Sequence, residues 1–133
     1  MIITDKSLKK LVKSIKCYEV KESIESYPEQ ERGDKTDLEI VRDEVEYFIY
    51  MFEEVDGAFK DDLDHSREIL RKTRNGKTIP IDIRSFKPIY PSWRIDQAKR
   101  TVSEYKQLKR ILIKLKEVRI CKTKLLYSQL WRV

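Results

Sequence analysis

Apolar residues recur every three or four positions between Ser92 and about Val118, which predicts a long amphipathic helix in the last third of the chain. Ser92 can cap its first turn, because a serine oxygen accepts backbone N–H groups that have no partner inside the helix. After Ile113 the pattern drifts, so we expect a bend, a break or a change of neighbour between Lys116 and Lys122. The apolar stripe consists of Ile95, Ala98, Val102, Tyr105, Leu108 and Leu112.

The chain is predicted to begin with a single helix that starts near Thr4 or Asp5. Its pattern weakens after Glu19, and Pro28 ends it. Residues 28–35 are polar and contain a glycine, so we expect a flexible link there. The apolar side of this first helix is formed by Leu8, Leu11, Val12, Ile15 and Tyr18.

A capping box at Thr36 and Glu39 marks the start of the next helix, because the hydroxyl and the carboxylate can each satisfy a backbone N–H. Its main apolar face carries Leu38, Val41, Val45, Phe48, Ile49, Phe52 and Val55, and the face is widened by Ile40, Tyr47 and Met51. A helix this apolar must be covered by more than one neighbour, so we expect it to be the core helix.

A further helix is predicted from about Ala58 to Lys72, and it ends at Asn75 and Gly76, which tolerate positive φ. Its contact residues are Phe59, Leu63 and Leu70, and Ile69 flanks them.

The hydrophobic period then changes to two, because Ile79, Ile81 and Ile83 alternate with Pro80 and Asp82. This alternation predicts a short strand, and the proline places it at a sheet edge. Three partners remain open for the strand: residues 2–4, the segment after residue 84, and a second copy of the chain.

These patterns predict one mainly α domain over residues 1–133, a helical bundle with a long C-terminal helix and a small β element near residues 78–84. Residues 84–92 serve as a proline-stiffened connector into the long helix. The 133 residues are too few for two large cores, and the hydrophobic 40% falls into stripes, which argues against general disorder.

Charge is distributed unevenly along the chain. Residues 1–21 carry a net charge of +4 and residues 22–72 one of −10, whereas residues 73–92 carry +3 and residues 93–133 carry +9. An acidic middle therefore lies between two basic ends.

The predicted terminal helices carry cations opposite their apolar stripes. Cations spaced one turn apart suit a phosphate backbone and give salt-dependent binding without sequence reading. The alternative is that they are merely solvated or neutralise the acidic middle of the same molecule. The candidate nucleic-acid-binding residues are Lys99, Arg100, Lys106, Arg110 and Lys114 near the C-terminus and Lys9, Lys13 and Lys16 near the N-terminus.

The connector is a candidate partner-binding site, because Phe86, Tyr90 and Trp93 lie among basic residues. Such rings can anchor a protein partner or stack on single-stranded bases. We expect instead that they cover the end of the bundle, since large aromatic side chains are mostly buried.

The acidic middle is another candidate partner-binding site, and Asp61, Asp62 and Asp64 are its residues of interest. Clustered carboxylates can imitate a nucleic-acid backbone and occupy the basic channel of a nucleic-acid enzyme. The simpler interpretation is an acidic face that is paired internally.

The sequence contains no motif of a known catalytic or cofactor site, so we predict a non-enzymatic protein with no cofactor and no metal. Asp61 and Asp62 precede the single histidine, His65, by one helical turn, but further ligands at a suitable spacing are missing. Without a membrane-length apolar run or a C-x-x-C pair, we expect a cytoplasmic protein with Cys17 and Cys121 reduced and no membrane partner.

The leading hypothesis is therefore a nucleic-acid-binding accessory protein, for DNA or RNA, that uses the basic faces of its first and last helices, with a homodimer as one arrangement. The alternative is a protein-binding module, such as an inhibitor or subunit of a nucleic-acid enzyme of viral or mobile-element type. That module would act through the acidic middle or the aromatic connector.

Overall fold

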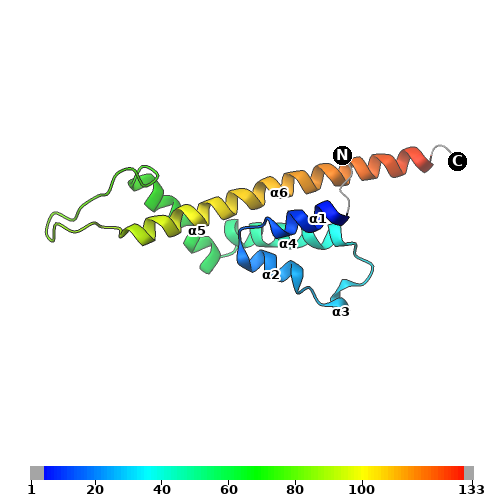
Figure 1. The fold of residues 1–133 in the computed structure, drawn as a ribbon, viewed down its shortest axis with the longest axis horizontal. Helices are drawn as coiled ribbons and strands as arrows, with labels where there is room; N and C mark the ends of the chain where they lie inside the picture. The colour runs from blue at the N-terminus through cyan, green and yellow to red at the C-terminus, as the bar shows by residue number, and fades with distance from the viewer. Residues whose placement is uncertain (1–4, 131–133) are drawn as a thin grey trace. The chain divides into compact units, whose positions relative to one another are not determined.

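The computed structural model describes residues 5–130, with side chains described for residues 6–117, and its architecture is mainly α, as predicted (Figure 1). Over these residues the helices are α1 (Asp5–Lys13), α2 (Tyr18–Glu25), α3 (Glu29–Arg32), α4 (Asp37–Glu53), α5 (Ala58–Lys72) and α6 (Ser92–Leu130). The predicted long C-terminal helix is confirmed.

Two compact units are present. The first contains residues through Ile49 together with those from Gln107 onward, and the second is Tyr50–Lys106. α4 and α6 each contribute residues to both units. The organisation into a single domain stays a prediction.

The apolar stripe predicted for α6 is confirmed in full, because all six of its members are buried. Beyond the stripe, Ile111 and Leu115 are buried as well, so the helix has a wide apolar face. The backbone stays helical through Lys122, so a break between Lys116 and Lys122 is wrong.

The first unit buries residues from four helices. Its core consists of Leu8, Val12, Ile15, Cys17, Val20, Ile40, Val41, Val45, Phe48, Ile49, Leu108, Ile111, Leu112 and Leu115. Tyr47 was expected to widen the contact face of α4, but its side chain is exposed. The Cys17 thiol donates to Glu19 Oε2 at 3.4 Å, and the side chain of Cys121 lies outside the described residues.

The single helix predicted at the N-terminus is instead two helices, α1 and α2. α1 ends where the Ser14 hydroxyl donates to the Leu11 carbonyl at 2.6 Å, a local bond that competes with the helical ladder. Gln107 of α6 then occupies the turn: its Nε2 donates to Ser14 O at 2.7 Å, and its Oε1 accepts the Lys16 N–H at 2.8 Å. Tyr18 consequently begins α2 and is 68% exposed instead of joining the stripe.

The segment at residues 28–35 contains a single helical turn, α3. It leads to the predicted cap of α4, where the Glu39 N–H donates to Thr36 Oγ1 at 3.2 Å. The Glu39 carboxylate accepts the Thr36 hydroxyl, also at 3.2 Å. The predicted role of the Thr36 hydroxyl as acceptor of a backbone N–H is therefore confirmed, whereas the Glu39 carboxylate accepts a side-chain hydroxyl instead of the expected backbone N–H.

The second unit has an aromatic and aliphatic core. Phe52 contacts Phe59 and Tyr105 edge to face, with ring centroids 5.1 and 5.9 Å apart. Ile69 of α5 packs with Ile95 and Ala98 of α6 in a buried cluster. Leu63 is confirmed as a buried contact residue of α5, and the predicted bounds of the helix are also confirmed. Ile69, which was expected only to flank the contact face, is fully buried too.

The turn after α5 follows the predicted chemistry. Asn75 and Gly76 have φ of 60° and 84°, and Arg74 also has a positive φ, of 49°. Thr73 is buried there; its hydroxyl donates to Ile69 O at 2.7 Å and accepts the Gly76 N–H at 3.1 Å.

The predicted β element is reduced to one antiparallel bridge, between Ile81 and Pro88, and no strand forms within residues 5–130. Its partner is the segment after residue 84, one of the three alternatives. Pro80 and Pro88 lack backbone N–H groups, so a longer ladder cannot form here.

Candidate nucleic-acid interface

The cations predicted to bind nucleic acid are all exposed, because burial of the apolar stripes turns their faces to solvent. In the second unit, α6 presents Lys99, Arg100 and Lys106. In the first unit the exposed cations are Arg110 and Lys114 on α6 and Lys9 and Lys13 on α1. Lys16 is exposed too, but it lies in the turn after α1 instead of on a helix, because α1 ends at Lys13.

The carboxylates of the acidic middle pair mainly with cations close to them in sequence. Arg32 pairs with Asp37, and Lys35 and Arg42 both pair with Asp43. Farther along the chain the pairs are Lys60 with Asp56 at 3.3 Å and Lys72 with Glu68 at 2.9 Å. Water solvates and screens both partners of such surface pairs, so the pairs balance charge locally and add little to stability.

Seven of the candidate cations on α1 and α6 differ from these in forming no ion pair with a described residue. Within the described residues, no ion pair involves Lys9, Lys13, Lys99, Arg100, Lys106, Arg110 or Lys114. The alternative was that these cations neutralise carboxylates of the same molecule. For these seven residues, no ion pair in the described part of the chain supports that alternative.

Arg94 contacts two residues of the acidic middle. Its Nη2 lies 3.7 Å from Asp62 Oδ1 and 3.1 Å from His65 Nδ1. The other Asp62 oxygen accepts the Thr101 hydroxyl at 3.0 Å. Arg94 and Thr101 lie on α6, and no short-range sequence signal marks them as partners of α5.

This arrangement gives Asp62 and His65 a structural role at the α5–α6 contact. Because Arg94 is always a donor, the bonded Nδ1 of His65 acts as the acceptor. Asp61 and Asp64 stay exposed. Among the described residues, no three His, Cys, Asp or Glu side chains are grouped as a metal site.

The three aromatic rings of the connector region differ in their exposure to solvent. Tyr90 packs against the buried cluster of Ile69, Ile95 and Ala98, as we expected for all three rings. Phe86 is 82% exposed and Trp93 is 66% exposed, so for these two that expectation is wrong. Phe86 has a positive φ of 58° and lies near the start of the connector.

In the second unit, Glu68 and Lys72 of α5 shift each other's pKa. The hydrogen bond and charge of Lys72 lower the pKa of Glu68, and those of Glu68 raise the pKa of Lys72. Both groups are exposed, so the pair is a surface feature and gives no sign of catalytic tuning.

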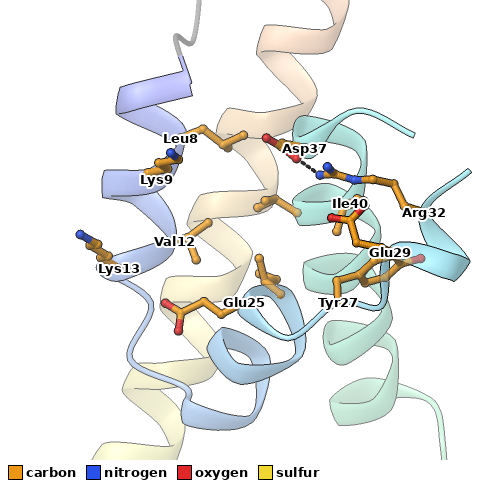
Figure 2. A pocket seen from close by; sticks show the side chains of 12 residues that line it. Leu8, Lys9, Val12, Lys13, Glu25, Tyr27, Glu29, Arg32, Asp37 and Ile40 are labelled. Atoms are coloured by element: carbon orange, nitrogen blue, oxygen red, sulfur yellow. Dashed lines mark ion pairs between the residues drawn. The ribbon is translucent and has the colours of Figure 1, made fainter. Parts of the chain in front are cut away.

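The first unit contains a cavity of about 350 Å³ beside α1, α2, α3 and α4 (Figure 2). Its walls include the apolar side chains of Leu8, Val12, Ile24, Tyr27, Ile40 and Val41. Charged groups of both signs line it as well: Lys9, Lys13 and Arg32, and Glu25, Glu29 and Asp37. Two of these lining residues, Arg32 and Asp37, form an ion pair, as Figure 2 shows. Local sequence patterns do not indicate this cavity, because its walls come from separate helices.

Comparison of the chain with known protein families, curated proteins and solved structures finds no match. Across the residues that the structure describes, no helix combines the length and the apolar character needed to cross a membrane.

Proposed function

We propose that this chain is a non-enzymatic protein that associates with nucleic acid through the basic faces of α1 and α6. The observation that supports the proposal is that seven cations on these faces are exposed and form no ion pair with a described residue: Lys9, Lys13, Lys99, Arg100, Lys106, Arg110 and Lys114. Such cations can exchange their counterions for phosphates, which favours binding most strongly at low salt.

The test is a salt titration of binding to random duplex and single-stranded DNA and RNA. At about 50 mM salt, where phosphate contacts are strong, we expect clear binding that weakens steeply as salt rises. Reversing Lys106, Arg110 and Lys114 to Glu should abolish it. Absence of binding at low salt would contradict the proposal.

A matched control is available in the chain. Reversing Lys35, Lys60 and Lys72 to Glu changes the net charge by the same amount, but these lysines belong to the local ion pairs. We expect this control to retain most of the binding. Equal loss in both triple variants would mean that net charge alone, and no particular face, governs the affinity.

A second candidate function is a protein-binding module, such as an inhibitor or subunit of a nucleic-acid enzyme. The exposure of Phe86 and Trp93 favours the connector over the acidic middle as its contact surface. In the acidic middle, Asp62 is already engaged by Arg94 and Thr101.

A further inference from the structure

The chain that joins α5 to α6 in Figure 1 contains a hairpin arm, which we define as residues 78–89 of the second unit. The Asp82 N–H donates to Lys87 O at 2.9 Å, and the Ile89 N–H donates to Pro80 O at 2.9 Å. These two bonds bracket the bridge between Ile81 and Pro88. In an antiparallel pair of this kind, the backbone groups of the bridged residues point away from the hairpin.

The two outer edges of the arm therefore differ. The edge at Pro88 has no N–H to offer. On the other edge, the N–H groups of Ile79 and Ile81 donate no hydrogen bond to any described residue. Since residues two apart on an extended chain face the same way, one edge is open to an additional strand.

The arm and its junction with α6 expose an unusual amount of apolar surface. The exposed large side chains there are Ile79, Ile81, Ile83, Phe86, Ile89 and Trp93. Ile83, at the tip, is 86% exposed. Several exposed apolar side chains within one short segment are typical of an interaction surface.

The charges that border this surface are positive. Lys77, Arg84 and Lys87 are exposed and form no ion pair with any described residue. The single acid of the arm, Asp82, is used within the turn, where its carboxylate accepts the Arg84 N–H at 3.2 Å and the Ser85 hydroxyl at 3.0 Å. A partner of complementary charge is therefore acidic.

We propose that the arm binds an extended acidic segment of a partner protein, rich in aliphatic residues, which adds as a strand along the Ile79–Ile81 edge. Nucleic acid fits less well, because four of the six exposed side chains are isoleucines, which have no aromatic face for base stacking, and because an open strand edge pairs with a peptide backbone. A second copy of the chain would bring basic arms together, which is repulsive. The inference rests on the protein-binding candidate function and does not use the basic faces of α1 and α6.

The experiment titrates the full chain against a fluorescent synthetic peptide of alternating Glu and Val. We expect binding that the double variant Ile79→Ser/Ile81→Ser weakens by about tenfold or more, since both the apolar contacts and the strand register depend on these residues. The matched control is Ile113→Ser, because Ile113 is similarly exposed but lies on α6. The control should bind as the unaltered chain does.

Two further probes define the mode of binding. A Glu–Val peptide with N-methylated backbone cannot donate to the edge and should not bind. Reversing Lys77, Arg84 and Lys87 to Glu should switch the preference to a Lys–Val peptide. Each of these results supports strand addition to a basic edge, and the contrary result in either overturns it.

Other results would show that a different partner binds the arm. Displacement of the peptide by random single-stranded DNA would assign the arm to nucleic acid and overturn the proposal. A dimer, detected by light scattering, that the Ile79→Ser/Ile81→Ser variant dissociates would assign it to a second copy. If Phe86→Ser abolishes peptide binding while the Ile79→Ser/Ile81→Ser variant retains it, protein binding by the connector stands and strand addition fails.

Discussion

The side-chain oxygen of Gln107 accepts the backbone N–H of Lys16 at 2.8 Å, so a residue of α6 satisfies the turn between α1 and α2. Its amide nitrogen meets the Ser14 carbonyl at the same time. One side chain thus replaces two backbone bonds that a continuous helix would have made, and it fixes where the chain turns.

Replacing Gln107 with Ala should lower the free energy of unfolding by about 1–2 kcal/mol, because two backbone groups lose their partner at a half-exposed site. Chemical denaturation measures the effect. Lys106→Ala is the control, since that neighbouring side chain is exposed and has no ion partner among the described residues. Equal stability of both variants would show that water replaces Gln107 without cost.

Two buried hydroxyls of the second unit should respond in opposite ways. Thr73→Val removes a donor to Ile69 O and an acceptor for the Gly76 N–H, and should cost about 1–3 kcal/mol. Ser66 Oγ is buried without a hydrogen-bond partner in the described structure, so Ser66→Ala should be neutral or stabilising. A clear loss of stability in Ser66→Ala, measured by thermal unfolding, would reveal a partner for that hydroxyl.

Glycine substitutions offer a second matched pair. At Gly76, φ is +84° and a Cβ would lie 2.7 Å from Lys99 Cε and 3.2 Å from Ile95 Cγ2. We expect Gly76→Ala to destabilise the protein by about 1 kcal/mol or more. Gly57 precedes α5 in an extended conformation with open space around its Cα and no side-chain cap.

Gly57→Ser should therefore stabilise the protein by roughly 0.5–1 kcal/mol, by restricting the unfolded chain and by capping α5. Thermal unfolding of the two variants side by side checks both signs. If Gly57→Ser destabilises the protein as much as Gly76→Ala does, the argument from backbone conformation is wrong.

The hydrogen bond to Glu22, together with the charge of that carboxylate, raises the pKa of Tyr18 above its ordinary value. Because the folded-state pKa is the higher one, this bond contributes to stability below the unfolded phenol pKa and is lost as pH rises through the folded pKa. Glu22→Gln should lower the pKa of Tyr18, as followed by NMR of the ring during an alkaline titration. Glu25→Gln, on the same helix, should leave it unchanged.

The sequence was sufficient for features that depend on local periodicity. The buried stripe of α6, the bounds of α5, the Thr36 cap and the Asn75–Gly76 turn all follow from spacing and residue type. Features that depend on distant partners could not be predicted in this way. The α1–α2 turn requires Gln107, more than ninety positions away in the chain.

The same limit applies to the candidate sites. The sequence indicates which lysines lie opposite an apolar stripe, but not which of them a carboxylate reaches. Aromatic rings are mostly buried in proteins, so the sequence predicts burial for all of them. Phe86 and Trp93 are exposed and depart from this average. The exposure of Phe86 follows from the arm, whose two prolines and single bridge give the ring little to pack against.

The basic border of the arm also bears on how the protein behaves in a concentrated solution. An open strand edge invites association between identical chains, and Lys77, Arg84 and Lys87 oppose it by mutual repulsion, as gatekeeper charges do beside hydrophobic strands elsewhere. Added salt screens that repulsion while it weakens phosphate contacts. Aggregation of this protein should therefore increase at the same high salt concentrations that release it from a polyanion.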